Sequence, residues 1–281
     1  MKNIIEIDIS ENNCYTSSYG KVNGWVLCKK LGLPTFSKLY MVKDYIDVCE
    51  DSILSTFGKS PLLCRTDAPW GHGNKLPRGR NVTVMQINNF LKEIKQCTSK
   101  GVVLIYKNPY GLDKQEIIPR YELDGGIFVL FEFDRILVEH VGKGFDVGDI
   151  TRGKTVHNSI VIPNCIMYDT PYEIFKYSKV IFPDNFYTIS SKDYKNDKIN
   201  RENELVYVLN EQSYSTTKNK IPDFVQPLTL DLFKKIYQEC IEKVIYTDVV
   251  LRKPFGIMMN LYHDVFCIFE VWQERRSLPV P

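Results

Sequence analysis

Cationic side chains gather in one glycine-containing segment of the chain, residues 60–82, SPLLCRTDAPWGHGNKLPRGRNV. A short apolar run delivers an arginine into a loop that carries further basic residues. Guanidinium and ammonium groups suit phosphate oxygens, and glycine lets the backbone approach an anion closely. The segment predicts a polyphosphate clamp and favours nucleotide chemistry, although the sequence holds neither a GxxxxGK[ST] loop nor a GxGxxG turn. The cationic candidates are Lys21, Arg65, Lys75, Arg78 and Arg80.

Composition is that of an ordinary globular protein. The 281 residues are 44% hydrophobic and 25% charged, and the formal net charge of +2 is too small to favour nucleic acid or a membrane surface as a partner. The sequence has no apolar run of about 18 residues and its first residues do not resemble a signal peptide, so we expect a cytoplasmic protein. Eight cysteines are scattered singly, which predicts buried, reduced thiols.

Hydrophobic periodicity predicts an α+β protein of two lobes, an N-terminal lobe over residues 1–100 and a C-terminal lobe over residues 101–281. Residues 176–217 are rich in polar residues and suggest a looped connector. The expected helices span residues 24–31, 41–55, 83–97 and 230–244. The expected strands span residues 36–41, 61–64, 101–108, 126–131, 135–141, 255–261 and 265–271.

Two glutamates stand in expected strands. Glu270 interrupts the apolar run VFCIFEV, and a buried carboxylate there needs a cation, a metal ion or a raised pKa. Glu139 alternates with Leu137 and Val141, so it belongs to one face of its strand and either meets solvent or binds a metal ion.

Four segments resemble, in the same order, the ATP-binding domain of phosphoenolpyruvate synthase and pyruvate phosphate dikinase, an ATP-grasp module. They are YGKVNGWVLCKKLGLPT, PLLCRTDA, LDGGIFVLFEFDRILVEHVGKGFDVGDITRG and VFCIFEVWQERRSLP. The resemblance implies an ATP-grasp-like α+β fold in which a nucleotide lies in a cleft between the β-sheets of two lobes.

The resemblance also implies site residues. ATP phosphates would contact Lys21, Arg65 and Lys75, and Arg65, Arg78 and Arg80 would act on the reacting groups. Adenine would lie against the strand of Val103, Ile105 and Lys107. Mg²⁺ would be held by Glu139, Glu270 and Gln273. One departure stands out: Met258 and Asn260, in FGIMMNLYHD, occupy positions where the family places a metal-binding carboxylate.

The predicted function is ATP-dependent activation of a carboxylic acid or transfer of a phosphoryl group, as a ligase or a phosphotransferase. The expected partners are a small-molecule acid and a carrier protein or separate phosphotransfer subunit. One alternative is a cysteine-nucleophile acyltransferase or peptidase built on Cys14 and His157. Another is a non-catalytic module that binds a nucleotide or RNA, although the aromatic residues are not interleaved with Lys and Arg as RNA binding favours.

Overall fold

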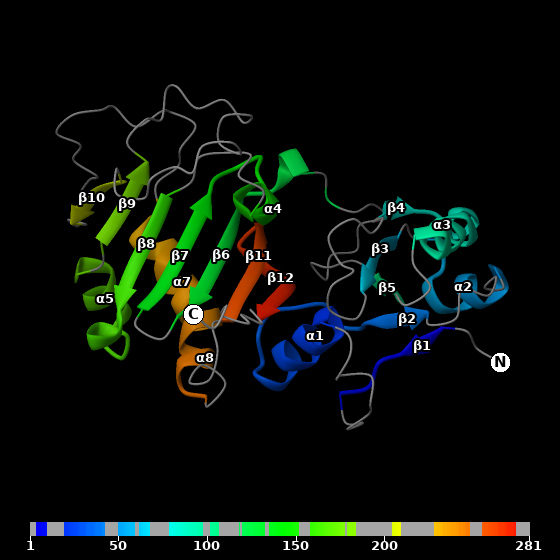
Figure 1. Cartoon of the computed structure of the whole chain (residues 1–281), viewed down its shortest axis with the longest axis horizontal. Helices are drawn as coiled ribbons and strands as arrows, with labels where there is room; N and C mark the ends of the chain where they lie inside the picture. Colours follow the sequence, from blue (N-terminus) through cyan, green and yellow to red (C-terminus); the bar gives the residue numbers. More distant parts are fainter. Residues whose placement is uncertain are drawn as a thin grey trace, which may run out of the picture. The chain divides into compact units, whose positions relative to one another are not determined.

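The chain forms two compact units, which Figure 1 shows and which are described separately here: Met1–Ile118 and Pro119–Pro281. Each unit combines one antiparallel sheet with helices, so the predicted α+β class is confirmed. The expected boundary after residue 100 differs from the observed division after Ile118. The computed structural model describes residues 4–9, 20–42, 50–59, 62–67, 79–97, 102–106, 118, 120–132, 135–151, 158–177, 179–183, 204–208, 228–247 and 255–273.

The first unit is built on a five-stranded sheet in the order β1-β2-β5-β3-β4. The strands are β1 (Ile5–Glu6), β2 (Tyr40–Val42), β3 (Leu62–Asp67), β4 (Gly79–Val82) and β5 (Val102–Tyr106). Because β5 is hydrogen-bonded to both β2 and β3, it is the central strand of this sheet rather than part of the C-terminal lobe. The helices are α1 (Gly20–Lys30), α2 (Glu50–Phe57) and α3 (Val84–Cys97).

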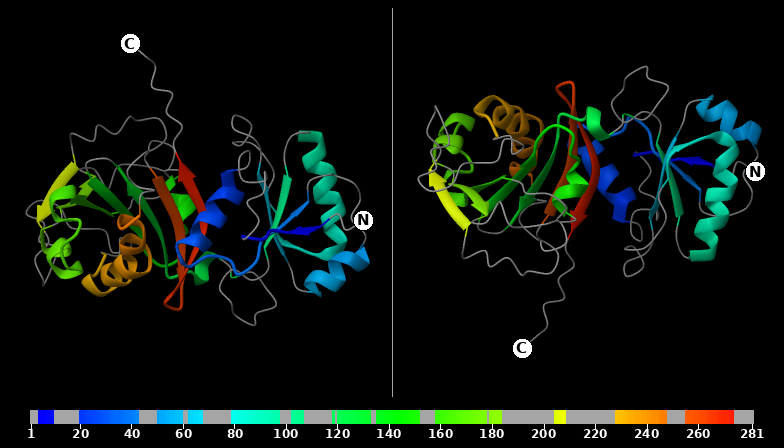
Figure 2. Two further views of the ribbon diagram at one scale, coloured as in Figure 1. Left: turned by 90° about the horizontal axis from the view of Figure 1, so that it is seen from below. Right: turned by 90° about the horizontal axis from the view of Figure 1, so that it is seen from above.

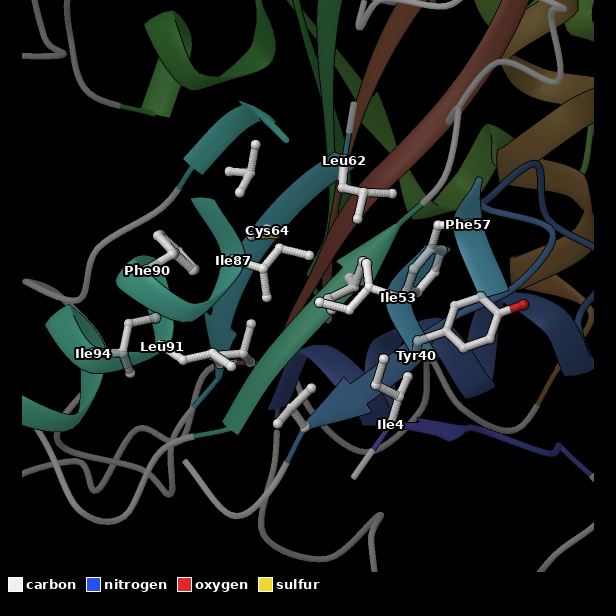
Figure 3. Close-up of a cluster of buried hydrophobic side chains, with 14 residues drawn as sticks. Ile4, Tyr40, Ile53, Phe57, Leu62, Cys64, Ile87, Phe90, Leu91 and Ile94 are labelled. Carbon is white, nitrogen blue, oxygen red and sulfur yellow. The ribbon is translucent and has the colours of Figure 1, made fainter. Parts of the chain in front are cut away.

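A hydrophobic core fills the space between this sheet and the helices α2 and α3 (Figure 3). Helix α2 contributes Ile53 and Phe57, and α3 contributes one apolar stripe at helical spacing. From the sheet, alternate residues of each strand enter the core, as Leu62 and Cys64 do in β3. The α3 stripe consists of Ile87, Phe90, Leu91 and Ile94.

Helix α1 packs on the opposite face of the same sheet. Trp25 Nε1 donates a hydrogen bond to the carbonyl of Phe36 at 2.9 Å, and the Phe36 ring lies 4.0 Å from that of Tyr106 in β5. The helix ends at Lys30, one residue before its expected end, and Gly32 follows with a φ of +64° that suits glycine. The first sheet is therefore covered by helices on both faces.

The second unit is built on a seven-stranded antiparallel sheet in the order β10-β9-β8-β7-β6-β11-β12. Its strands are β6 (Gly125–Phe131), β7 (Arg135–Val141), β8 (Asn158–Pro163), β9 (Lys179–Pro183), β10 (Glu204–Val208), β11 (Phe255–Tyr262) and β12 (Val265–Gln273). Strands β9 and β10 fall inside the stretch expected to be a looped connector. That expectation was wrong for these two strands, which pair with each other and extend the sheet beyond β8.

Helix α5 (Pro171–Tyr177) and one longer continuous helix lie together on one side of the second sheet (Figure 2). The longer helix consists of α7 (Leu230–Ile236), a π-helical turn (Tyr237–Ile241) and α8 (Glu242–Ile245). The long helix confirms the prediction for residues 230–244, and Thr229 caps its start by accepting a hydrogen bond from Leu232 N. Short helix α4 (Val147–Thr151) packs against β6, β7 and β11. Among the described residues, no helix is long and apolar enough to cross a membrane.

Candidate functional site

The beginning of α1 is fastened to the end of β3 by one carboxylate. Asp67 Oδ2 accepts hydrogen bonds from the backbone N–H groups of Lys21, at 2.7 Å, and Val22, at 3.1 Å. Asp67 is only 4% exposed, so this contact is buried. The carboxylate satisfies donors that the first turn of a helix leaves without intrahelical partners and complements the positive end of the helix dipole.

Arg65 lies in the same corner of the first unit. Arg65 and Asp67 are two residues apart in β3, so their side chains leave the same face of the sheet, the face that carries α1. Arg65 is half-buried, as is Lys21. The structure thus brings together two predicted phosphate contacts from distant parts of the sequence. We call Lys21, Arg65 and Asp67 the α1 corner.

The other predicted residues of the first unit divide into two groups. Val103 and Ile105 are fully buried in the core shared with α2 and α3, and both backbone edges of β5 are paired. Their side chains pack the core, so the expected adenine contact at these two residues is replaced by core packing. Lys75, Arg78 and Lys107 lie outside the described residues, and Arg80 is described only as a backbone position in β4. Their predicted roles stay predictions.

The second sheet has one fully buried face and one half-exposed face. In β6, Ile127 and Val129 are buried whereas Phe128 and Leu130 are partly exposed, and the same alternation runs through β7 and β8. In β11, Met258 is partly exposed and the other residues are buried. The pairing register places the partly exposed residues together on one side of the sheet. We call this the open face; its residues are Phe128, Leu130, Leu137, Glu139, Ser159, Val161, Met258 and Glu270.

Five open-face residues form one row across five neighbouring strands. The register pairs Ser159 with Glu139, Glu139 with Phe128, Phe128 with Met258, and Met258 with Glu270. Both predicted glutamate ligands therefore lie on one face and in one row. Because neighbouring strands are about 4.8 Å apart, three strand spacings place the two backbone positions about 14 Å from each other.

A β-bulge puts Glu270 on this face. Ile268 pairs with Met259, which belongs to the buried face, yet Glu270 pairs with Met258 of the open face. In a regular strand, residues 268 and 270 would share a face. Phe269 is the extra residue of the bulge. After it, the alternation of side chains between the two faces is shifted by one residue, so Glu270 lies on the open face and Val271 lies on the buried face. This explains how a carboxylate is tolerated in an apolar strand.

One end of the open face is covered by α4. Gly126 of β6 lies so close to this helix that a Cβ atom there would overlap the backbone of Asp146 and Val147. Asn260 of β11 fastens the helix, because its Oδ1 accepts a hydrogen bond from Val147 N at 2.8 Å. Asp149 Oδ2 accepts another from Asp146 N at 3.0 Å. All these groups are buried, so this end of the face is filled by protein.

The donor set on the open face fits poorly to a multi-carboxylate Mg²⁺ centre. Phe128 and Met258 stand between Glu139 and Glu270, Met258 beside Glu270 offers a thioether, and Asn260 Oδ1 is already an acceptor within the protein. Among the described residues, no group of three or more His, Cys, Asp and Glu side chains could hold a metal ion. Gln273, the third predicted ligand, is described only as a backbone position in β12.

The alternative cysteine site involves Cys14 and His157, which both lie outside the described residues. Of the cysteines that the structure describes with their side chains, Cys28, Cys64, Cys240 and Cys267 are buried and Cys165 is exposed, and all five are thiols outside any disulfide. Burial raises the pKa of both Cys28 and Cys64 to about 12. These two thiols are therefore protonated and unreactive at neutral pH.

Sequence reasoning missed two residues that organise the candidate surfaces. Asp67 directly follows the RT dipeptide of β3, and a carboxylate at the end of an apolar strand could have been matched to the uncapped start of α1. Asn260 was noted only as a missing metal ligand. A polar residue in the middle of the apolar strand FGIMMNLY is a signal for a buried hydrogen bond, which the structure supplies.

No family model and no curated protein sequence matches the chain. Among solved structures, it is similar to the D-alanine–D-alanine ligase of Helicobacter pylori, with a TM-score of 0.43 and 11% identity over 90% of this chain and 53% of that one. It is also similar to the D-alanine–D-alanine ligase of Bacillus anthracis complexed with ATP, with a TM-score of 0.34 and 12% identity over 87% of this chain and 52% of that one. The chain spans about half the length of both ligases, and similarity this distant assigns no function.

Proposed function

We propose that this chain is an ATP-grasp-like protein that binds ATP and uses it to activate a carboxylic acid or to transfer a phosphoryl group. The α1 corner of the first unit would take the phosphates of the nucleotide. The observation that supports the proposal is that the Lys21 backbone N–H donates to Asp67 Oδ2 at 2.7 Å while Arg65 stands two residues from Asp67 on the same face of β3, so two half-buried cationic residues belong to one corner of the sheet.

The α1 corner carries cationic groups that suit a phosphate ligand. The Asp67 carboxylate already accepts the backbone N–H groups of Lys21 and Val22, so the phosphate contact would come from the Lys21 ammonium and the Arg65 guanidinium. Asp67 would hold the first turn of α1 in place and so fix the direction of the Lys21 side chain. Cations held in this way would neutralise the charge that develops on a transferring phosphoryl group.

The open face of the second unit is a separate candidate surface. Phe128 and Met258 pack partly against the cluster of Val141, Val147 and Ile150 beneath α4, whereas Leu130 is partly exposed and Glu139 adds a carboxylate that accepts hydrogen bonds. Arg78 and Arg80 stay candidates for directing the acid, and a carrier protein or separate phosphotransfer subunit stays a candidate partner.

A thermal-shift experiment on the full chain tests the proposal. The melting temperature is measured with ATP, with GTP and without nucleotide, for the wild type, Arg65→Ala and Lys59→Ala. Lys59 is the matched control, because it is an exposed cation of the same unit outside the α1 corner. We expect ATP to stabilise the wild type and Lys59→Ala but not Arg65→Ala. Equal stabilisation of all three proteins would contradict the placement of the phosphates.

Turnover is measured separately. The wild-type chain is incubated with ATP, Mg²⁺ and a panel of carboxylic acids, and release of ADP or AMP is followed. Acid-dependent release supports the enzyme, and the product identifies whether an acyl phosphate or an acyl adenylate is formed. Nucleotide binding without any release would instead support the non-catalytic binding module.

A further inference from the structure

We infer that nucleotide binding by this chain does not depend on a divalent ion held by the second sheet, and that Met258 is the residue responsible. This inference rests on the proposed function, since it concerns the same nucleotide. A divalent ion would arrive as part of the nucleotide complex and stay on the phosphates, without a carboxylate pair on the open face to anchor it.

Met258 occupies the position nearest to Glu270. The two residues are directly opposite each other on the open face, and side chains in such a pair have Cβ atoms about 5 Å apart. This is the one place in the row where a second carboxylate could share an ion with Glu270. Mg²⁺ prefers hard oxygen ligands at about 2.1 Å, and a thioether is a soft ligand that does not suit it.

Asn260 does not replace the missing carboxylate. It lies two residues further along β11, but its Oδ1 accepts the hydrogen bond from Val147 N at 2.8 Å, and the residue is only 5% exposed. Turning this oxygen toward an ion would leave a buried N–H without an acceptor, which costs about 1–3 kcal/mol. Asn260 is therefore committed to holding α4 against the sheet.

Glu139 does not supply the missing carboxylate either. Phe128 and Met258 lie between Glu139 and Glu270 in the row, and the two backbone positions are about 14 Å apart. The apolar side chains of Phe128 and Met258 stand between the two carboxylates, and the described residues hold no group of three or more His, Cys, Asp and Glu side chains that could bind a metal ion. Glu270 is therefore the one carboxylate at its end of this row of described residues.

The charge of the phosphates is then balanced elsewhere. Lys21 and Arg65 in the α1 corner are fixed cations, and they act whether or not a divalent ion is present. Binding that relies on these cations should survive chelation of Mg²⁺. Loss of the arginine should weaken binding more than loss of the ion.

The first measurement uses Mn²⁺ alone as a probe. Its binding to the full chain is followed by electron paramagnetic resonance for the wild type, Met258→Glu, Met258→Gln and Leu130→Glu. We expect Met258→Glu to bind Mn²⁺ at least about tenfold more tightly than the wild type, because it pairs a second carboxylate with Glu270. Met258→Gln keeps a similar size without the charge, and Leu130→Glu adds a charge to the open face away from Glu270, so neither should gain affinity.

The second measurement titrates ATP into the same proteins with Mg²⁺ and with EDTA. The wild type should bind ATP with dissociation constants within about twofold of each other under the two conditions, and Met258→Glu should bind more tightly with Mg²⁺. Tight, Glu270-dependent Mn²⁺ binding by the wild type, or loss of ATP binding in EDTA, would overturn the inference. If the wild type bound no nucleotide under either condition, the proposed function itself would fail.

Discussion

Glu139 of β7 and Glu270 of β12 lie in one row on the open face of the second sheet, with Phe128 and Met258 between them. Both glutamates are predicted Mg²⁺ ligands. Their side chains share a face, and three strand spacings separate their backbones by about 14 Å. The row therefore holds two carboxylate positions with apolar side chains between them.

The separation predicts that these two carboxylates act independently. Glu139→Gln and Glu270→Gln are compared with the double variant in calorimetric titrations with ATP. Substitutions more than about 10 Å apart are usually additive within about 0.5 kcal/mol, so the loss of binding free energy in the double variant should equal the sum of the single losses. A coupling energy above about 1 kcal/mol would mean that the two groups share an ion or a network.

The β-bulge makes a second prediction, because it places Ile268 and Glu270 on opposite faces. Ile268 is only 2% exposed, so Ile268→Ala should reduce the free energy of unfolding by about 2–5 kcal/mol in urea denaturation. Glu270→Ala, on the half-exposed face, should change it by less than about 1 kcal/mol. Similar losses for the two variants would indicate a regular strand in which both side chains share one face.

The bulge is a feature of the fold that the sequence pattern alone does not predict. Period-two alternation identified Glu270 as anomalous, but the single residue added at Phe269 becomes visible only in the pairing with β11. In β5, every residue is apolar, so the sequence could not tell that Val103 and Ile105 enter the core with α2 and α3. Long periodic segments were predicted well; strand β7 was predicted at its observed bounds, Arg135–Val141.

Helix α4 supplies a third prediction. Gly126→Ala should lower the free energy of unfolding by at least about 2 kcal/mol, because the added methyl group overlaps the backbone at the start of α4. Asn260→Ala should cost about 1–3 kcal/mol by leaving Val147 N–H without its acceptor. Ser159→Ala, on the half-exposed part of the same face, is the control and should be nearly neutral. Wild-type stability of Gly126→Ala would show that α4 is not in close contact with β6.

The buried thiols give a fourth prediction, on pH. Burial raises the pKa of Cys28 and of Cys64 from 9.0 to about 12, so the folded protein keeps both thiols protonated. Their contribution to stability is complete below pH 9 and is lost as the pH rises from 9 toward 12, because the unfolded chain ionises first.

In native protein at pH 8, iodoacetamide followed by peptide mass spectrometry should label the exposed Cys165 and spare Cys28 and Cys64. Fast native labelling of either buried thiol would contradict their placement.

The most direct test of the account asks whether the α1 corner binds the phosphates of a nucleotide. Calorimetric titration of ATP is carried out on the full-length wild type and on Arg65→Ala in the α1 corner, with Lys59→Ala as the control. The account predicts that the wild type and the control bind ATP and that Arg65→Ala loses at least about tenfold in affinity, or about 1.4 kcal/mol. Wild-type affinity in Arg65→Ala would contradict it.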